Sequence, residues 1–360
     1  MANKPQTRRE LLAKTTGMVA GSTLASHIAG AAANAGSTAA TRPASKILNY
    51  NPKMGYRVLG KTGIRISEIG LGGHGTPGFQ GKVNREVVEN RRRVLERAAE
   101  LGINYLDTNI ASECELYGRA LGSKGRENWQ IGFASWPQKL TEDYEANLSP
   151  KGMMAQIEAR LEAYNTDRLD IWRPVGAALA TDRTAMVSRR VLDMVVEVYE
   201  KAKRGGKVIH LGISAHNPRV ARIVLENYPQ FAVVLFPYLL LTPQMKGNGV
   251  TELAAEKNVG VIAIKPFGAG MVFGLRPRSL HDKVDANAPV ILKKVLQARG
   301  ISAVIPGVNQ PEQLAVNVKA SYERQAAMTP RDERLLAHYD ATLRSHLTPE
   351  YAWLRWWMHA

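Results

Sequence analysis

The chain has 360 residues, of which 45% are hydrophobic, and it carries one cysteine and a formal net charge of +16. Its length and apolar content suffice for a large core in a single α/β domain. One cysteine, Cys114, excludes an intrachain disulfide and a cysteine-rich metal or iron–sulfur site. The basic residues, including Arg91, Arg92 and Arg93 within a helical pattern, are scattered, which favours a solvated surface over nucleic-acid binding.

Residues 1–35 have the pattern of an export signal. Residues 7–14 read TRRELLAK, which is similar to a twin-arginine motif, and a weakly apolar run follows before Ala33, Asn34 and Ala35 form a small-x-small cleavage site. We therefore predict a twin-arginine signal peptide, the Tat export machinery as a partner and a periplasmic or other extracytoplasmic location. The alternative is a disordered basic N-terminus. No stretch approaches the roughly 18 apolar residues of a stable membrane span.

Residues 36–53 are small, polar and proline-containing, which is typical of a linker. From Tyr56 onward, short β-rich runs alternate with helical patterns, as in a parallel sheet. Eight strands are predicted, at residues 65–71, 103–108, 129–135, 168–175, 208–214, 233–238, 259–266 and 302–307. Helices are predicted after them, at residues 86–101, 113–121, 150–163, 188–204, 217–227, 250–257, 287–299 and 311–323.

Eight β/α units favour a closed (β/α)8 TIM barrel over residues 54–329. The alternative, a doubly wound sheet, lacks a G-x-G-x-x-G motif after an early strand. Residues 330–360 are interpreted as a C-terminal extension, made of one helix and an aromatic tail with three tryptophans in its last eight residues. This tail is either a flap or partner surface, or a segment packed against the barrel wall.

Function in such barrels lies where the strands end in the carboxyl direction. The predicted strand ends place these residues at the mouth: His74, Asp107, Trp136, Val175, Ser214, Tyr238, Lys265 and the Pro306–Gly307 turn.

Several segments resemble the aldo/keto reductase family across nearly all of residues 55–323. Residues 56–73 read YRVLGKTGIRISEIGLGG, which is similar to the family's opening hairpin and first strand. Residues 102–108 (GINYLDT) and 112–121 (SECELYGRAL) resemble the second strand and the helix after it. Residues 206–214 (GKVIHLGIS), 260–266 (GVIAIKP) and 304–314 resemble later strands in the family's order. The resemblance implies reduction of a small-molecule carbonyl with NADP or NAD as cofactor.

The family's catalytic residues are an Asp, a Tyr, a Lys and a His, and only the first has a counterpart here. The Asp corresponds to Asp107, whereas the Tyr, Lys and His positions hold Ser112, Trp136 and Val175. Because strand parity places residue 173 on the same face as 175, we predict that Arg173 replaces the missing Lys as the partner of Asp107. His74 and Tyr117, and with them Glu113 and Lys139, are weaker candidates for the chemistry.

The resemblance also implies cofactor contacts, with no metal. Ser214 corresponds to the residue that contacts the carboxamide, Tyr238 to the one that stacks on the nicotinamide, and Lys265 to a phosphate contact. The turn at Gly307, the helix start after it, and Gln313 and Asn317 would hold the adenosine end. The expected Asn and Gln of the family are replaced by Ala215 and Leu235.

Three functions remain open at this point. The first is an NAD(P)H-dependent oxidoreductase with a non-standard active site that acts on a carbonyl or sugar-type substrate. The second is a non-catalytic barrel that binds a ligand or partner, and the third is a lyase or isomerase on the same scaffold.

Overall fold

The computed structural model describes residues 47–72, 83–135, 149–174, 189–240, 249–275 and 284–346, all within one compact unit of the chain. The predicted signal peptide, His74, Trp136, Lys139, Val175 and the aromatic tail lie outside these ranges. No helix of the described ranges is long and apolar enough to cross a membrane.

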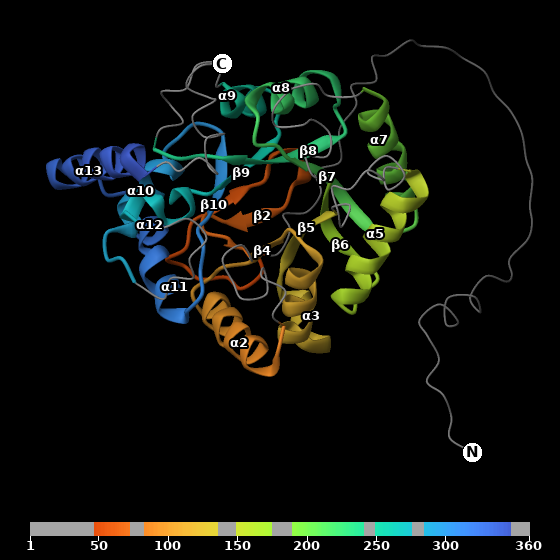
Figure 1. Cartoon of the computed structure of the whole chain (residues 1–360), viewed down its shortest axis with the longest axis horizontal. Helices are drawn as coiled ribbons and strands as arrows, with labels where there is room; N and C mark the ends of the chain where they lie inside the picture. Colours follow the sequence, from red (N-terminus) through yellow and green to blue (C-terminus); the bar gives the residue numbers. More distant parts are fainter. Residues whose placement is uncertain are drawn as a thin grey trace, which may run out of the picture. The chain divides into compact units, whose positions relative to one another are not determined.

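Eight parallel strands form a nearly closed barrel that is ringed by helices (Figure 1), so the predicted fold is confirmed. In the sheet the strands lie in chain order from β3 to β10, so each inner strand pairs with the one that precedes it and the one that follows it in the sequence. The ends of this sheet meet where Gly70 N donates to Val304 O at 2.9 Å and Val304 N donates to Glu68 O at 2.9 Å. The strands are β3 (Leu71–Gly72), β4 (Tyr105–Thr108), β5 (Gln130–Ser135), β6 (Leu169–Pro174), β7 (Val208–Ser214), β8 (Phe231–Pro237), β9 (Gly260–Ile264) and β10 (Ile301–Ile305).

The first predicted strand, residues 65–71, is wrong as a single element. Residues Arg65–Ser67 form β2, which pairs antiparallel with β1 (Tyr56–Val58) across the short helix η1 (Gly60–Thr62), as the predicted N-terminal hairpin. The chain joins the barrel after it, through a parallel bridge between Ile69 and Val304 and through β3. The hairpin side chains Leu59, Ile64 and Ile66 pack inside the barrel. Because Lys61 N donates to Asn258 O just before β9, this hairpin closes the amino-terminal end of the strands.

The helices begin where the local chemistry favours a helix start. Asn84 accepts a hydrogen bond from Val87 N, and Ser149 accepts one from Gly152 N, so these side chains cap the next helices. The helices are α2 (Arg85–Glu100), α3 (Ala111–Gly125), α5 (Pro150–Ala163), α7 (Arg189–Arg204), α8 (Pro218–Asn227), α9 (Val250–Glu256), α10 (Ala288–Leu296), α11 (Pro311–Asn317), α12 (Lys319–Tyr322) and α13 (Pro330–His346). The short helices η3 (Arg126–Asn128) and η5 (Gly268–Phe273) complete the set that the described ranges contain.

The core has an inner and an outer layer. Side chains inside the barrel include Tyr105, Ile171 and Leu235, while a larger cluster that includes Phe133 and Trp172 packs between the sheet and the helices. Alternate residues of a strand therefore face the barrel interior and the helices. A third cluster joins α10, η5 and α13, so the predicted C-terminal helix packs against the barrel wall.

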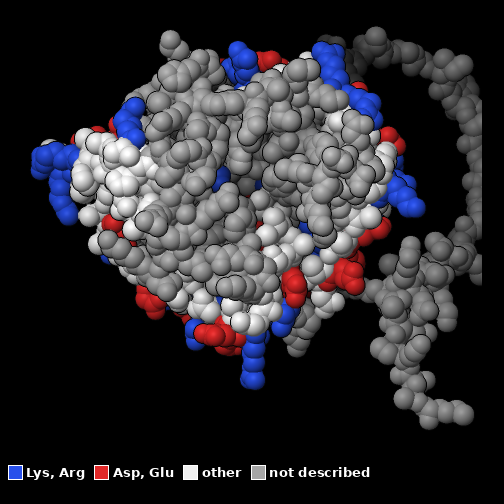
Figure 2. Space-filling model, in the orientation of Figure 1, with Lys and Arg blue, Asp and Glu red and all other residues white. Residues whose placement is uncertain are grey.

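Two sequence-based interpretations change in the structure. Arg91 is buried, and its terminal nitrogens donate to Tyr117 Oη and Val308 O, so it is not part of a solvated face. Arg92 and Arg93 are exposed as expected, and on the face shown in Figure 2 the described basic residues are spread around the periphery among acidic ones. The last residues of the expected linker also contact the barrel, since Asn49 and Asn51 donate to Ile103 O and Glu100 O.

Candidate active site at the barrel mouth

The centre of the candidate site is an ion pair between two neighbouring regions of the barrel wall. Arg173 Nη2, from β6, lies 2.8 Å from Asp107 Oδ2, from β4, and also donates to Thr108 O at 3.1 Å. The side chain of Arg173 is 1% exposed and that of Asp107 is 11% exposed. The pairing that strand parity predicts is therefore present in the structure.

Tyr105 extends this pair into a buried three-residue cluster that the sequence analysis missed. Its hydroxyl donates to Asp107 Oδ1 at 3.0 Å, so each carboxylate oxygen of Asp107 accepts one side-chain hydrogen bond. Tyr105 lies two residues before Asp107 on the same strand, and period-two alternation would have placed both side chains on one face. Because Tyr105 is fully buried, its role is to orient Asp107 and not to touch a substrate.

Glycines on the neighbouring strands make room for this cluster. Gly132 lies opposite Asp107 in the parallel register, and a Cβ added there would lie 2.1 Å from Tyr105 Oη and 2.9 Å from Asp107 Oδ1. A Cβ at Gly212 would lie 3.1 Å from Arg173 Cγ. The barrel interior is thus shaped around three polar side chains at a level where barrels usually hold branched apolar ones.

Burial dominates the electrostatics of the cluster. Desolvation raises the pKa of Asp107 to about 6, although the Arg173 guanidinium and the Tyr105 hydroxyl favour the ionised form and lower the pKa. Burial likewise raises the pKa of Tyr105 well above its usual value. Asp107 can therefore exchange a proton near neutral pH, whereas Tyr105 stays protonated.

The weaker candidates have structural roles. Tyr117 is fully buried and its hydroxyl donates to Gly72 O at 2.9 Å, while burial raises its pKa to about 12, so it packs and does not serve as an acid at the mouth. Glu113 is also buried and caps α3, because its Oε2 accepts from the amides of Asn109 and Ile110. Ser112 is half-buried in the first turn of α3. Cys114 is buried, and its pKa is raised to about 12, so it is an unreactive thiol.

Three of the predicted cofactor residues end neighbouring strands. Ser214 is the last residue of β7, Tyr238 follows β8, and Lys265 follows β9. The sheet holds them together, since Ala215 N donates to Leu235 O and Tyr238 N donates to Ile264 O. Lys265 has a φ of 57°, a left-handed conformation that is rare outside glycine and is often found at functional sites.

The residues predicted to bind the adenosine end of the cofactor are less available for contact with a ligand. Gln313 Oε1 accepts from the amides of Asn309 and Gln310, so this side chain caps α11 and occupies donors that a phosphate would otherwise use. Asn317 is buried in the same short helix, whereas Gly307 is exposed after β10. The described residues thus fit the nicotinamide end of a cofactor better than the far end. Among them, no group of three or more His, Cys, Asp or Glu side chains could hold a metal ion.

Comparisons with known proteins identify the family and the fold. Residues 68–288 match the sequence model of the Aldo/keto reductase family. The chain is 24% identical over 327 residues to L-glyceraldehyde 3-phosphate reductase of Escherichia coli strain K12, a match that covers 74% of this chain and 88% of that protein. It is 24% identical over 325 residues to L-galactose dehydrogenase of Arabidopsis thaliana, covering 81% and 95% of the two chains. Among solved structures, the holo form of aldo-keto reductase AKR11C1 from Bacillus halodurans shares the fold with a TM-score of 0.59 at 20% identity, over 83% of this chain and 99% of that one.

Proposed function

We propose that this chain, which belongs to the aldo/keto reductase family, is an oxidoreductase that uses NADPH or NADH on a carbonyl or sugar-type substrate. The observation that carries the proposal is the Asp107–Arg173 ion pair, which occupies the barrel mouth where the family carries out its chemistry. The relatives named for L-glyceraldehyde 3-phosphate and L-galactose support a sugar-type substrate.

In this proposal the strand ends from β7 to β9 hold the nicotinamide. The ring of Tyr238 would stack on it, Ser214 would contact its carboxamide, and Lys265 would face a phosphate. The bound cofactor would supply the hydride. Tyr238 is suited to stacking because it is 8% exposed and its backbone is held between β8 and β9, so its ring has little freedom to lose on binding.

Asp107 and Arg173 have different roles in this site. A guanidinium does not release its proton near neutral pH, whereas a carboxyl with a pKa of about 6 does. Asp107 is also the more exposed member of the pair. We assign proton transfer to Asp107 and positioning to Arg173, which takes over the part that a Lys has in the family pattern. The buried Nε of Arg173 makes no hydrogen bond to the described residues.

Cofactor binding tests the proposal most directly. NADPH and NADH are titrated against the full chain and followed by fluorescence. Tyr238→Ala should weaken binding about tenfold, as expected for a lost stacking contact. Tyr228→Ala is the matched control, because this tyrosine follows α8 and donates to Asp193, outside the mouth.

The outcomes separate the three functions. Binding together with turnover of L-glyceraldehyde 3-phosphate, or oxidation of L-galactose, supports the proposal. Binding without turnover on a wider carbonyl panel favours a non-catalytic barrel or a lyase or isomerase. If the chain binds neither NADPH nor NADH, the oxidoreductase function is rejected.

We also propose that residues 1–35 are a twin-arginine signal peptide and that the mature protein is extracytoplasmic. The paired Arg8 and Arg9 and the cleavage pattern at Ala33–Ala35 support this. The test is a reporter fused to residues 1–45, with Arg8→Lys and Arg9→Lys together and Lys4→Arg as control. Export that persists in the double variant would overturn the proposal.

A further inference from the structure

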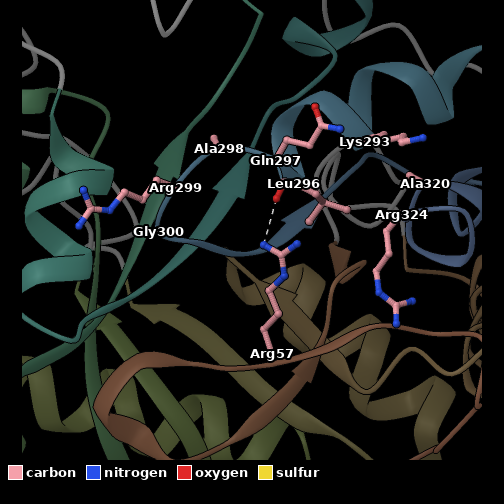
Figure 3. A pocket seen from close by; sticks show the side chains of 9 residues that line it. All are labelled: Arg57, Lys293, Leu296, Gln297, Ala298, Arg299, Gly300, Ala320 and Arg324. Carbon is pink, nitrogen blue, oxygen red and sulfur yellow. Dashed lines mark hydrogen bonds between the residues drawn. The ribbon is translucent and has the colours of Figure 1, made fainter. Parts of the chain in front are cut away.

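A cavity lies at the opposite end of the barrel from the mouth. It has a volume of about 400 Å³ and is lined by parts of the β1 hairpin, α10, the turn before β10, and α12 with the residues after it (Figure 3). The turn includes Gly300, which directly precedes β10, so the cavity opens at the amino-terminal end of the strands. This end of a barrel is not used by the chemistry proposed above.

Four basic side chains line this cavity, and no acidic residue is among its lining residues. They are Arg57, Lys293, Arg299 and Arg324. A concentration of positive charge around a cavity of this size is costly unless counter-ions or a ligand offset it. The volume is in the range of small-molecule sites, roughly 300–1,000 Å³.

Arg57 is held in place at the base of the cavity. Its Nε donates to Glu68 Oε1 at 2.8 Å, and its Nη1 donates to Leu296 O at 3.0 Å and Ile301 O at 2.7 Å. Glu68 is buried and is itself held by Ser321 Oγ. The guanidinium is therefore oriented before any ligand arrives, and its Nη2 has no hydrogen bond among those of the described residues.

The same contacts remove an obstacle to anion binding. The cavity lies against the end of α10, where free carbonyl groups would repel an anion. Arg57 donates to one of these carbonyls, that of Leu296, and so offsets its negative partial charge.

The other three cations are on long side chains of separate segments that line the cavity. In Figure 3 the charged ends of Lys293 and Arg299 point away from Arg57, so these side chains would have to turn inward to meet a ligand. Arg324 donates only to the neutral carbonyls of Lys53 and Ser321 in the described structure, so its charge is not neutralised there. By contrast, Lys294, the next residue of α10, lies 4.0 Å from Glu333 and does not line the cavity.

We propose that this cavity binds a small anion that carries two or more phosphate groups. A phosphate offers acceptor oxygens to Nη2 of the oriented Arg57, whose charge is paired with Glu68, and its multiple charge matches the three mobile cations. The site is independent of the cofactor site, which lies at the other end of the strands. Its ligand could be a free polyphosphate or a phosphorylated metabolite, and both share this chemistry.

Calorimetric titration of the full chain with inorganic tripolyphosphate tests the proposal. We expect one site per chain, with affinity falling more than about tenfold between about 50 mM and 500 mM NaCl because exposed charges are screened. Lys293→Ala and Arg324→Ala should each weaken binding about threefold, the effect of one exposed charge contact. Lys294→Ala is the matched control and should leave the affinity unchanged.

Several results would overturn the inference. One such result is that tripolyphosphate does not bind at low salt. Another is an equal loss of affinity in Lys294→Ala and Lys293→Ala, which would show a diffuse charge effect. Citrate that binds as tightly as tripolyphosphate would reject the assignment to phosphate. A titration in which fructose 1,6-bisphosphate competes with tripolyphosphate would favour a metabolite, and inability to compete would favour the free polyphosphate.

Discussion

Two buried Asp–Arg pairs lie within a few residues of each other, and they differ in what surrounds them. Asp107 pairs with Arg173 inside the barrel, whereas Asp170, on β6, pairs with Arg126 at 3.2 Å on the side that faces the helices. Burial raises the pKa of both carboxyl groups. Composition and burial alone therefore do not distinguish them.

The hydrogen-bond partners of the two pairs distinguish them. Asp170 accepts from Ile131 N at 2.7 Å, and Arg126 also donates to Trp129 O and Arg168 O, so this pair ties the start of β5 to the start of β6. Among the described residues, Asp107 accepts only from the side chains of Tyr105 and Arg173, and glycines lie opposite it or beside it on both neighbouring strands. The Asp170 carboxylate is thus held by a backbone amide at the start of a strand, whereas the Asp107 carboxylate is held by side chains alone, near the end of its strand at the mouth.

The largest difference is expected in catalysis. Asp107→Asn should lower kcat/KM about 100-fold or more, because it removes the carboxyl that exchanges a proton. Asp170→Asn should change kcat/KM less than about threefold, since it lies outside the mouth. Steady-state kinetics with the substrate found in the carbonyl panel measures both. Similar losses in the two variants would remove the functional distinction between the pairs.

Replacing the arginine of each pair should lower the stability of the folded protein by different amounts. Arg173→Met leaves Asp107 buried without a cation and should lower the free energy of unfolding by about 3–5 kcal/mol at about pH 8. Arg126→Met should cost about 1–2 kcal/mol, because Asp170 keeps the amide of Ile131 as a donor. Urea denaturation of the two variants gives these values.

The loss of unfolding free energy in Arg173→Met should depend on pH. Without the guanidinium, the pKa of Asp107 in the folded protein rises above about 6, while in the unfolded chain it stays near 3.8. The folded state then binds the proton more tightly, so stability falls as pH rises through this window. The destabilisation should be smaller at about pH 5 than at about pH 8. A loss that does not change with pH would show that Asp107 does not titrate there.

A smaller effect is expected at Gly132. Gly132→Ala places a methyl group against Tyr105 Oη and Asp107 Oδ1, which should cost about 1–3 kcal/mol and also lower kcat/KM. Gly205→Ala is the control, because the Cβ added there meets nothing closer than 3.4 Å. It should change stability by less than about 0.5 kcal/mol. An unaffected kcat/KM in a folded Gly132→Ala protein would argue against the role of Tyr105 in orienting Asp107.

The smallest effect is expected at Tyr117. Tyr117→Phe removes the hydrogen bond to Gly72 O and the acceptor of Arg91 Nη1, and should cost about 1–2 kcal/mol of stability without changing kcat/KM. Thermal unfolding together with kinetics measures both quantities. A large loss of kcat/KM would return Tyr117 to the list of acids.

The order of elements could be read from the sequence, because hydrophobic periodicity and helix caps are local. The spacing of β-rich and helical patterns predicts the eight-stranded barrel and the bounds of α5, and period-two alternation places Arg173 with Asp107. The N-terminal hairpin that the family resemblance implies is confirmed by the pairing of β1 with β2, but the bounds of the first predicted strand were wrong, since residues 65–67 belong to the hairpin and not to the barrel.

Only the tertiary structure decided what individual polar residues do. Arg91 and Tyr117 belong to types that are common on surfaces or in active sites, yet their partners come from distant segments that bury them. The basic cavity likewise gathers Arg57, Lys293 and Arg324 from positions more than 200 residues apart at the extremes. These contacts cannot be predicted from local sequence, because they form between segments that the closure of the barrel brings together and not between neighbours along the chain.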